Sequence, residues 1–67
     1  MRRTLSPREM AVFADYGTRT VSEIAQDLGL SVKTISTYLS RISDKLRIDS
    51  RADLKVMAKK FAEARPQ

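Results

Sequence analysis

The stretch SEIAQDLGLSVKTISTYLSRI, residues 22–42, decides the fold. It reads as a short helix, a turn that contains a glycine, and a longer helix. Ala25 is small enough for a second backbone to pass close to the first helix, and Gly29 tolerates the positive φ that a tight turn requires. The apolar residues that would close such a corner are Ile24, Leu28, Leu30 and Ile35. The stretch therefore predicts either a plain packed corner or a helix-turn-helix that reads DNA.

Helix signals extend on both sides of this corner. A Ser or Thr precedes each apolar periodic segment, at Ser6, Thr20, Ser31 and Ser50. Glu9 and Glu23 follow the first two caps by three positions and complete capping boxes, and Gly17 and Gly29 end the first two helices. No alternating pattern persists long enough to predict a strand. We expect an all-α fold with four helices, over about 7–16, 21–28, 32–46 and 51–64.

Each predicted helix carries an apolar stripe that should face a common core. The stripes consist of Met10, Phe13 and Ala14 in the first helix, Val21, Ile24, Ala25 and Leu28 in the second, Ile35, Leu39, Ile42 and Leu46 in the third, and Leu54, Met57, Ala58 and Phe61 in the fourth.

Length and composition set the limits of the function. The 67 residues are 42% hydrophobic and 31% charged, which predicts one folded domain over 1–67 with an ordered core at about 5–63 and frayed Pro66 and Gln67. Cysteine and histidine are absent, so we expect no disulfide and no metal site. The chain is short and shows no nucleophile motif or cluster of catalytic residue types, so we also expect no enzyme activity, cofactor or small-molecule ligand. No apolar run is long enough to span a membrane, and we expect a cytoplasmic protein without a membrane partner.

The charge balance favours a polyanionic partner. Thirteen Lys and Arg face eight Asp and Glu, which gives a formal net charge of +5. On a helical wheel with Ile35 facing the core, the residues that cluster opposite are Lys33, Thr37, Ser40, Arg41 and Asp44. Ordinary solvation explains such a face, but a basic, small and polar surface beside a helical corner indicates DNA binding.

At this point a family resemblance becomes specific. LSPRE, then SEIAQDLGLSVKTISTYLSRISDKL, then SRADL resemble the LuxR/FixJ-type (GerE-type) DNA-binding domain, and the resemblance covers about residues 5–62. The resemblance implies a four-helix domain with the third helix in the major groove of double-stranded DNA and the fourth contributing to dimerisation. It also implies the output domain of a bacterial transcriptional regulator, such as a response regulator or a quorum-sensing regulator.

The resemblance and the helical wheel together assign the contacts. We expect base contacts from Lys33, Ser36, Thr37 and Ser40. We expect phosphate contacts from Thr20, Val21 (through its backbone amide), Ser22, Thr34, Arg41, Lys45 and Arg51. Asp44 would end the groove contact by repelling phosphate. Tyr38 has two readings: its ring packs on the second helix, or its hydroxyl contacts a phosphate.

The fourth helix predicts self-association. Ala52, Val56 and Lys59 share a face, and we expect a weak homodimer contact there, formed on DNA. RNA polymerase is a further candidate partner. An alternative function is a protein-interaction module, in which the same corner binds a component of the transcription machinery instead of DNA.

Overall fold

The structure, a computed structural model, describes residues 4–64 and consists of four helices in that range. They are α1 (Pro7–Tyr16), α2 (Val21–Leu28), α3 (Val32–Leu46) and α4 (Arg51–Ala64). The predicted all-α class and the four predicted helices are confirmed, and no strand occurs in the described range. The expected fraying of Pro66 and Gln67 concerns residues outside it.

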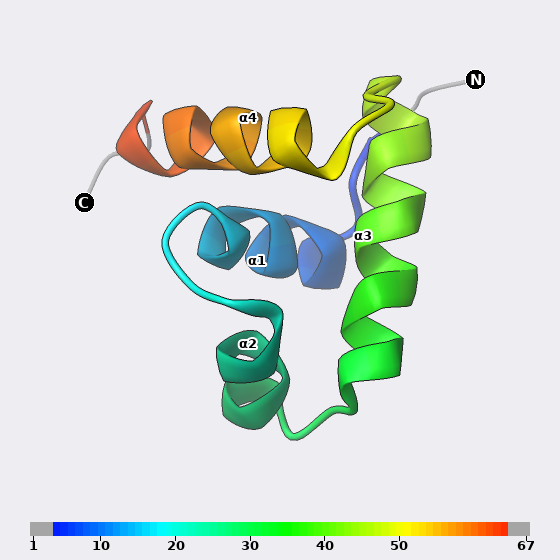
Figure 1. The fold of residues 1–67 in the computed structure, drawn as a ribbon, viewed down its shortest axis with the longest axis vertical. Helices are drawn as coiled ribbons and strands as arrows, with labels where there is room; N and C mark the ends of the chain where they lie inside the picture. Colours follow the sequence, from blue (N-terminus) through cyan, green and yellow to red (C-terminus); the bar gives the residue numbers. More distant parts are fainter. Residues whose placement is uncertain (1–3, 65–67) are drawn as a thin grey trace.

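The long helix α3 organises the molecule. Figure 1 shows α1, α2 and α4 on the same side of α3, with α1 between the other two. Helix α1 packs against all three other helices, and α2 packs against α1 and α3. The core between them is formed by Val12, Phe13, Tyr16, Ile24, Ala25, Ile35, Leu39, Ile42, Leu54 and Ala58. The opposite face of α3 is therefore left for solvent or a partner.

The predicted caps begin the helices as expected. At α1, the Ser6 amide donates to Glu9 Oε1 at 2.8 Å and the Glu9 amide donates to Ser6 Oγ at 3.2 Å, which makes a complete capping box. At α4, the Asp53 amide donates to Ser50 Oγ at 3.0 Å. These local bonds satisfy amides that have no partner within a helix, which is why the starts could be predicted from sequence.

The turn of the helical corner is a Schellman motif. Gly29 has a φ of 67°, its amide donates to Gln26 O at 3.3 Å, and the Leu30 amide donates to Ala25 O at 2.9 Å. Ala25 is buried, and Ile24 and Ile35 are fully buried on either side of the turn. The predicted geometry of the corner is confirmed.

The end of α3 repeats this motif without a glycine. Arg47 has a φ of 57°, its amide donates to Asp44 O at 3.3 Å, and the Ile48 amide donates to Ser43 O at 2.9 Å. Arg47 is the one non-glycine residue with a positive φ in the described range. Its left-handed conformation costs free energy that a glycine there would avoid.

Three predicted core residues lie at the surface instead. Met10, Leu46 and Met57 are 40%, 36% and 49% exposed. The inner face of α4 is centred on Leu54 and Ala58, which turns Met57 toward solvent. Leu46 lies in the last turn of α3, where it lines an open hollow together with Met57 and other residues. Helical spacing therefore predicted the correct buried face of these helices, but it overestimated the width and the length of the buried stripe.

Candidate nucleic-acid interface

The outer face of α3 carries most of the residues proposed to read bases. Lys33, Thr37, Ser40 and Arg41 are exposed, whereas Ile35, Leu39 and Ile42 on the inner face are fully buried. Ser36 is half-buried, so its hydroxyl has less reach than those of Thr37 and Ser40. We call Lys33, Thr37, Ser40 and Arg41 the outer face of α3 from here on.

One hydroxyl on this face already has a partner. Thr37 Oγ1 donates to Lys33 O at 3.1 Å within the helix. A threonine hydroxyl has one donor and can also accept, so in this rotamer Thr37 presents acceptor capacity and a methyl group. The matching groups in a major groove are the amino groups of adenine and cytosine and the methyl group of thymine.

The start of α3 is tied by its cap. The Thr34 amide donates to Ser31 Oγ at 3.1 Å, and the hydroxyl oxygens of Ser31 and Thr34 lie 2.9 Å apart. The amide and the hydroxyl of Thr34 are therefore both engaged in the cap. The residue lies at the rim of the outer face, half-buried, and the predicted phosphate contact would have to share its hydroxyl with Ser31.

A shallow hollow of about 180 Å³ opens beside the outer face. It is lined by Thr34, Thr37, Tyr38 and Arg41. Tyr38 is half-buried and packs against the core. Tyr38 also lines the hollow, so a phosphate contact from its hydroxyl belongs with the predicted DNA contacts of α3.

The N-terminus of α2 carries the second capping box. The Thr20 amide donates to Glu23 Oε1 at 2.8 Å, and the Glu23 amide donates to Thr20 Oγ1 at 3.2 Å. These bonds from Thr20 lower the pKa of Glu23, so the box is stable in its charged form. The box leaves the amides of Val21 and Ser22, both in the first turn, without a partner inside the helix.

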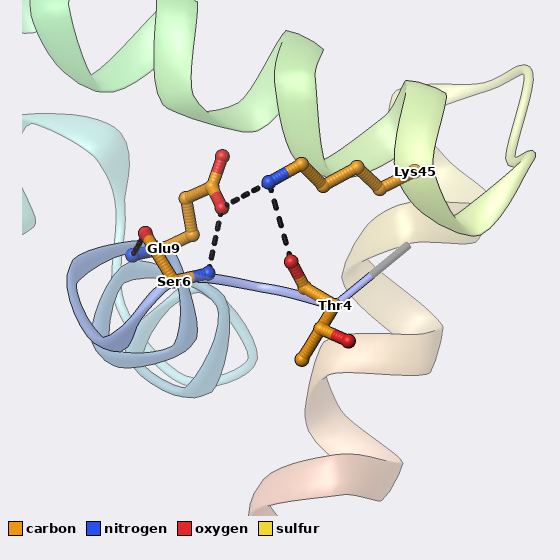
Figure 2. A network of polar contacts seen from close by, with 4 residues as sticks. All are labelled: Thr4, Ser6, Glu9 and Lys45. Atoms are coloured by element: carbon orange, nitrogen blue, oxygen red, sulfur yellow. Dashed lines mark hydrogen bonds and ion pairs between the residues drawn. The ribbon is translucent and has the colours of Figure 1, made fainter. Parts of the chain in front are cut away.

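Lys45, a predicted phosphate contact, is engaged within the fold. Figure 2 shows its ammonium between α1 and the residues that precede it. Lys45 Nζ lies 2.7 Å from Glu9 Oε1 and 3.3 Å from Thr4 O. The Glu9 carboxylate is almost fully buried, so this is a structural ion pair. Two of the three N–H donors of Lys45 are therefore held within the fold.

The predicted dimer residues lie together at the surface of α4. Ala52, Val56 and Lys59 are exposed, and the Val56 side chain is 55% exposed. Arg51, the last predicted phosphate contact, is exposed at the first position of the same helix.

The comparison with protein families agrees with this arrangement. Residues 3–58 match the family described as bacterial regulatory proteins, luxR family. The chain belongs to the luxR family. No curated protein and no solved structure matched the chain in the corresponding comparisons.

Membership of the luxR family identifies the kind of domain to which the corner belongs. The domain of this family is a helix-turn-helix DNA-binding domain of transcriptional regulators. In this luxR-family chain the helix-turn-helix unit consists of α2 and α3, joined at Gly29. The match extends from before α1 into α4, so all four helices belong to the family domain.

Residues 4–64 contain no group of three or more acidic, His or Cys residues that could hold a metal ion. None of the four described helices combines the length and the apolar character that crossing a bilayer requires.

Two side chains near the interface escaped sequence analysis. Lys55 Nζ donates to Tyr16 O at 2.9 Å and to Arg19 O at 3.3 Å, and the Arg19 guanidinium forms an ion pair with Asp27. The partners of Lys55 lie 39 and 36 residues away in sequence, so no local pattern could have indicated them.

Proposed function

We propose that this chain binds double-stranded DNA in a sequence-specific manner, in the cytoplasm, as the output domain of a bacterial transcriptional regulator, with α3 in the major groove. One observation carries the proposal: the exposed, polar and basic outer face of α3 lies on the second helix of a helix-turn-helix corner. A packed corner alone would not require Lys33, Thr37, Ser40 and Arg41 to share that face.

Base contacts would come from the first three turns of α3. Lys33 is long enough to reach the guanine edge, and Thr37 and Ser40 present small polar groups that can approach base edges without steric conflict. Ser36, which is half-buried, would be the fourth base contact.

Phosphate contacts would surround this groove contact. Arg41 lies further along α3, and Thr34 lies at its rim. On α2 the unpaired amides of Val21 and Ser22 and the hydroxyl of Thr20 face the same kind of ligand, since free amides at a helix start attract anions. Arg51 would contact the backbone from α4. We assign Lys45 mainly a role in stabilising the fold, because Glu9 and Thr4 already bind its ammonium.

A homodimer formed on DNA would pair through α4. The exposed Val56, flanked by Ala52 and Lys59, would supply the apolar part of a weak contact. Sedimentation on a duplex with two half-sites tests this pairing. Two protomers per duplex are expected for the wild type, and a single protomer at saturation would contradict it. A contact with RNA polymerase stays a prediction.

Retardation of mixed-sequence duplex DNA at low salt tests the proposal against its alternative. A DNA-binding domain shifts the duplex, and its affinity falls steeply as salt rises, because phosphate contacts release counterions. A protein-interaction module without duplex affinity leaves the DNA unshifted. A Lys33→Ala, Arg41→Ala double variant should weaken the shift, whereas Lys60→Ala, which removes a charge that is not among the predicted DNA contacts, should leave it nearly unchanged.

A further inference from the structure

Lys55 of α4 holds the end of α1 and the connection that follows it. Its ammonium donates to the carbonyl oxygens of Tyr16 and Arg19, at 2.9 Å and 3.3 Å. It also lies 4.6 Å from the centroid of the Tyr16 ring. One side chain therefore contacts both ends of the segment that joins α1 to α2.

The same segment is pressed against the backbone of α4. A Cβ atom built on Gly17 would lie 2.6 Å from Lys59 Cα and 2.8 Å from Ala58 C. Gly17 is buried, and no larger residue fits in this space without a shift of backbone. The path of residues 17–19 is thus set by α4 from two directions.

The path of residues 17–19 leads directly into the first turn of α2. Arg19 directly precedes Thr20, the cap of α2, so the carbonyl that Lys55 holds is one peptide bond from the capping box. On the other side, the Arg19 guanidinium is paired with Asp27 near the end of α2. After the bonds from Thr20, the charges of Arg19 and Lys55 also lower the pKa of Glu23, which places both cations close to this helix start.

We propose that Lys55 is a positioning residue for the DNA backbone contact of α2. By holding the carbonyls of Tyr16 and Arg19, it fixes the first turn of α2 so that the amides of Val21 and Ser22 meet a phosphate while α3 lies in the groove. This inference rests on the proposed function, and it assigns to α4 a role in DNA binding that is separate from dimerisation.

Lys55 acts through the backbone and not as a phosphate ligand. Two of its three N–H donors are taken by carbonyl oxygens, and its ammonium is directed toward the Tyr16 ring. The third N–H is the one donor that remains for a phosphate. The two roles predict different effects of removing Lys55. If Lys55 contacted a phosphate, its loss would remove one charge from the interface. If Lys55 positions α2, its loss moves the amides at the start of α2.

Amide NMR spectra of the ¹⁵N-labelled protein, recorded with and without duplex DNA, test the inference. The variants are Lys55→Met and, as a matched control, Lys60→Met, which removes the same charge from another face of α4. In the wild type, DNA should shift the amide resonances of Val21 and Ser22 as well as those of the outer face of α3. In Lys55→Met the α2 shifts should fall by about half or more, the α3 shifts should remain, and affinity should fall about tenfold.

The outcomes separate this inference from the function on which it rests. If Val21 and Ser22 shift in Lys55→Met as they do in the wild type and in Lys60→Met, the positioning role is wrong, whatever the affinity. If DNA shifts no amide in the wild type, the proposed function itself fails. Should Lys55→Met prove too unstable, Lys55→Gln carries the same comparison, since a short neutral amide does not span both carbonyls.

Discussion

Lys45 and Glu9 form an ion pair that joins the last turn of α3 to the first turn of α1, with 2.7 Å between Nζ and Oε1. The Glu9 carboxylate also accepts the Ser6 amide of the capping box. The pair is strongly asymmetric, because the Glu9 side chain is 5% exposed and that of Lys45 is 35% exposed. Removing Lys45 would leave a buried carboxylate without its cation, which is the costly way to break such a pair.

Lys45 and Arg41 should therefore affect different properties. Lys45→Met should lower the free energy of unfolding by about 1–3 kcal/mol, because it leaves the Glu9 carboxylate less satisfied. Arg41→Ala should leave the free energy of unfolding nearly unchanged and reduce the slope of log affinity against log salt by about one unit. Urea unfolding and salt titrations of DNA binding measure the two quantities. A Lys45→Met variant as stable as the wild type, with a reduced salt slope, would instead make Lys45 a phosphate ligand.

The same pair predicts how stability depends on pH. The bond from Lys45, followed by that from the Ser6 amide, lowers the pKa of Glu9 from its ordinary value of 4.5. Because the folded pKa is the lower one, the stabilisation is complete above the unfolded pKa and is lost as pH falls through the folded pKa. The difference in free energy of unfolding between the wild type and Glu9→Gln should be constant above about pH 5.5 and shrink below about pH 4.5. Urea unfolding over this range measures it, and a difference that does not change with pH would contradict the account.

Gly17 should be sensitive to side-chain size. An added Cβ would meet the backbone of α4 at Ala58 and Lys59, so Gly17→Ala should cost about 1–3 kcal/mol and Gly17→Asn more. At Gly29 no atom lies within 4 Å of an added Cβ and the φ is 67°, so Asn should be tolerated better than Ala. Thermal unfolding of the Ala and Asn variants at both positions measures which substitution is tolerated better at Gly17 and which at Gly29. Equal tolerance of Ala and Asn at Gly17 would refute the close packing.

Arg47→Gly should stabilise the domain. The residue has a left-handed conformation at the end of α3, where glycine is free of the penalty that a Cβ introduces. We expect a gain of about 1 kcal/mol in the free energy of unfolding. Arg47→Ala removes the same side chain but keeps the penalty, so it should give no gain. A similar effect of both substitutions in urea unfolding would show that the side chain matters and the backbone does not.

The helix limits could be predicted because their signals are local. Ser6 and Thr20 each bond to an amide three residues ahead, and Gly29 takes the left-handed conformation that the turn requires. Helical periodicity also identified Ile35, Leu39 and Ile42 as the buried face of α3. The residues on the opposite side of the helix could therefore be predicted to face solvent or a partner.

The remaining features depend on distant parts of the chain. The partners of Lys45 and Lys55 lie 36 or more residues away, and only the packing of α1 against α3 and α4 brings them together. For this reason sequence analysis predicted a phosphate contact for Lys45 and no role for Lys55. The exposure of Met57 depends in the same way on the rotation of α4 over α1, which the apolar spacing does not specify.

Selection of binding sites from random duplex DNA, followed by sequencing, tests the central claim most directly. The wild type should enrich one motif, and Lys33→Ala and Thr37→Val should each lose preference at one or two positions of that motif while the others persist, at a cost of about 1–3 kcal/mol. The control Lys60→Ala should select the wild-type motif. Enrichment of no motif, or of the same motif by all of these proteins, would contradict base reading by the outer face of α3.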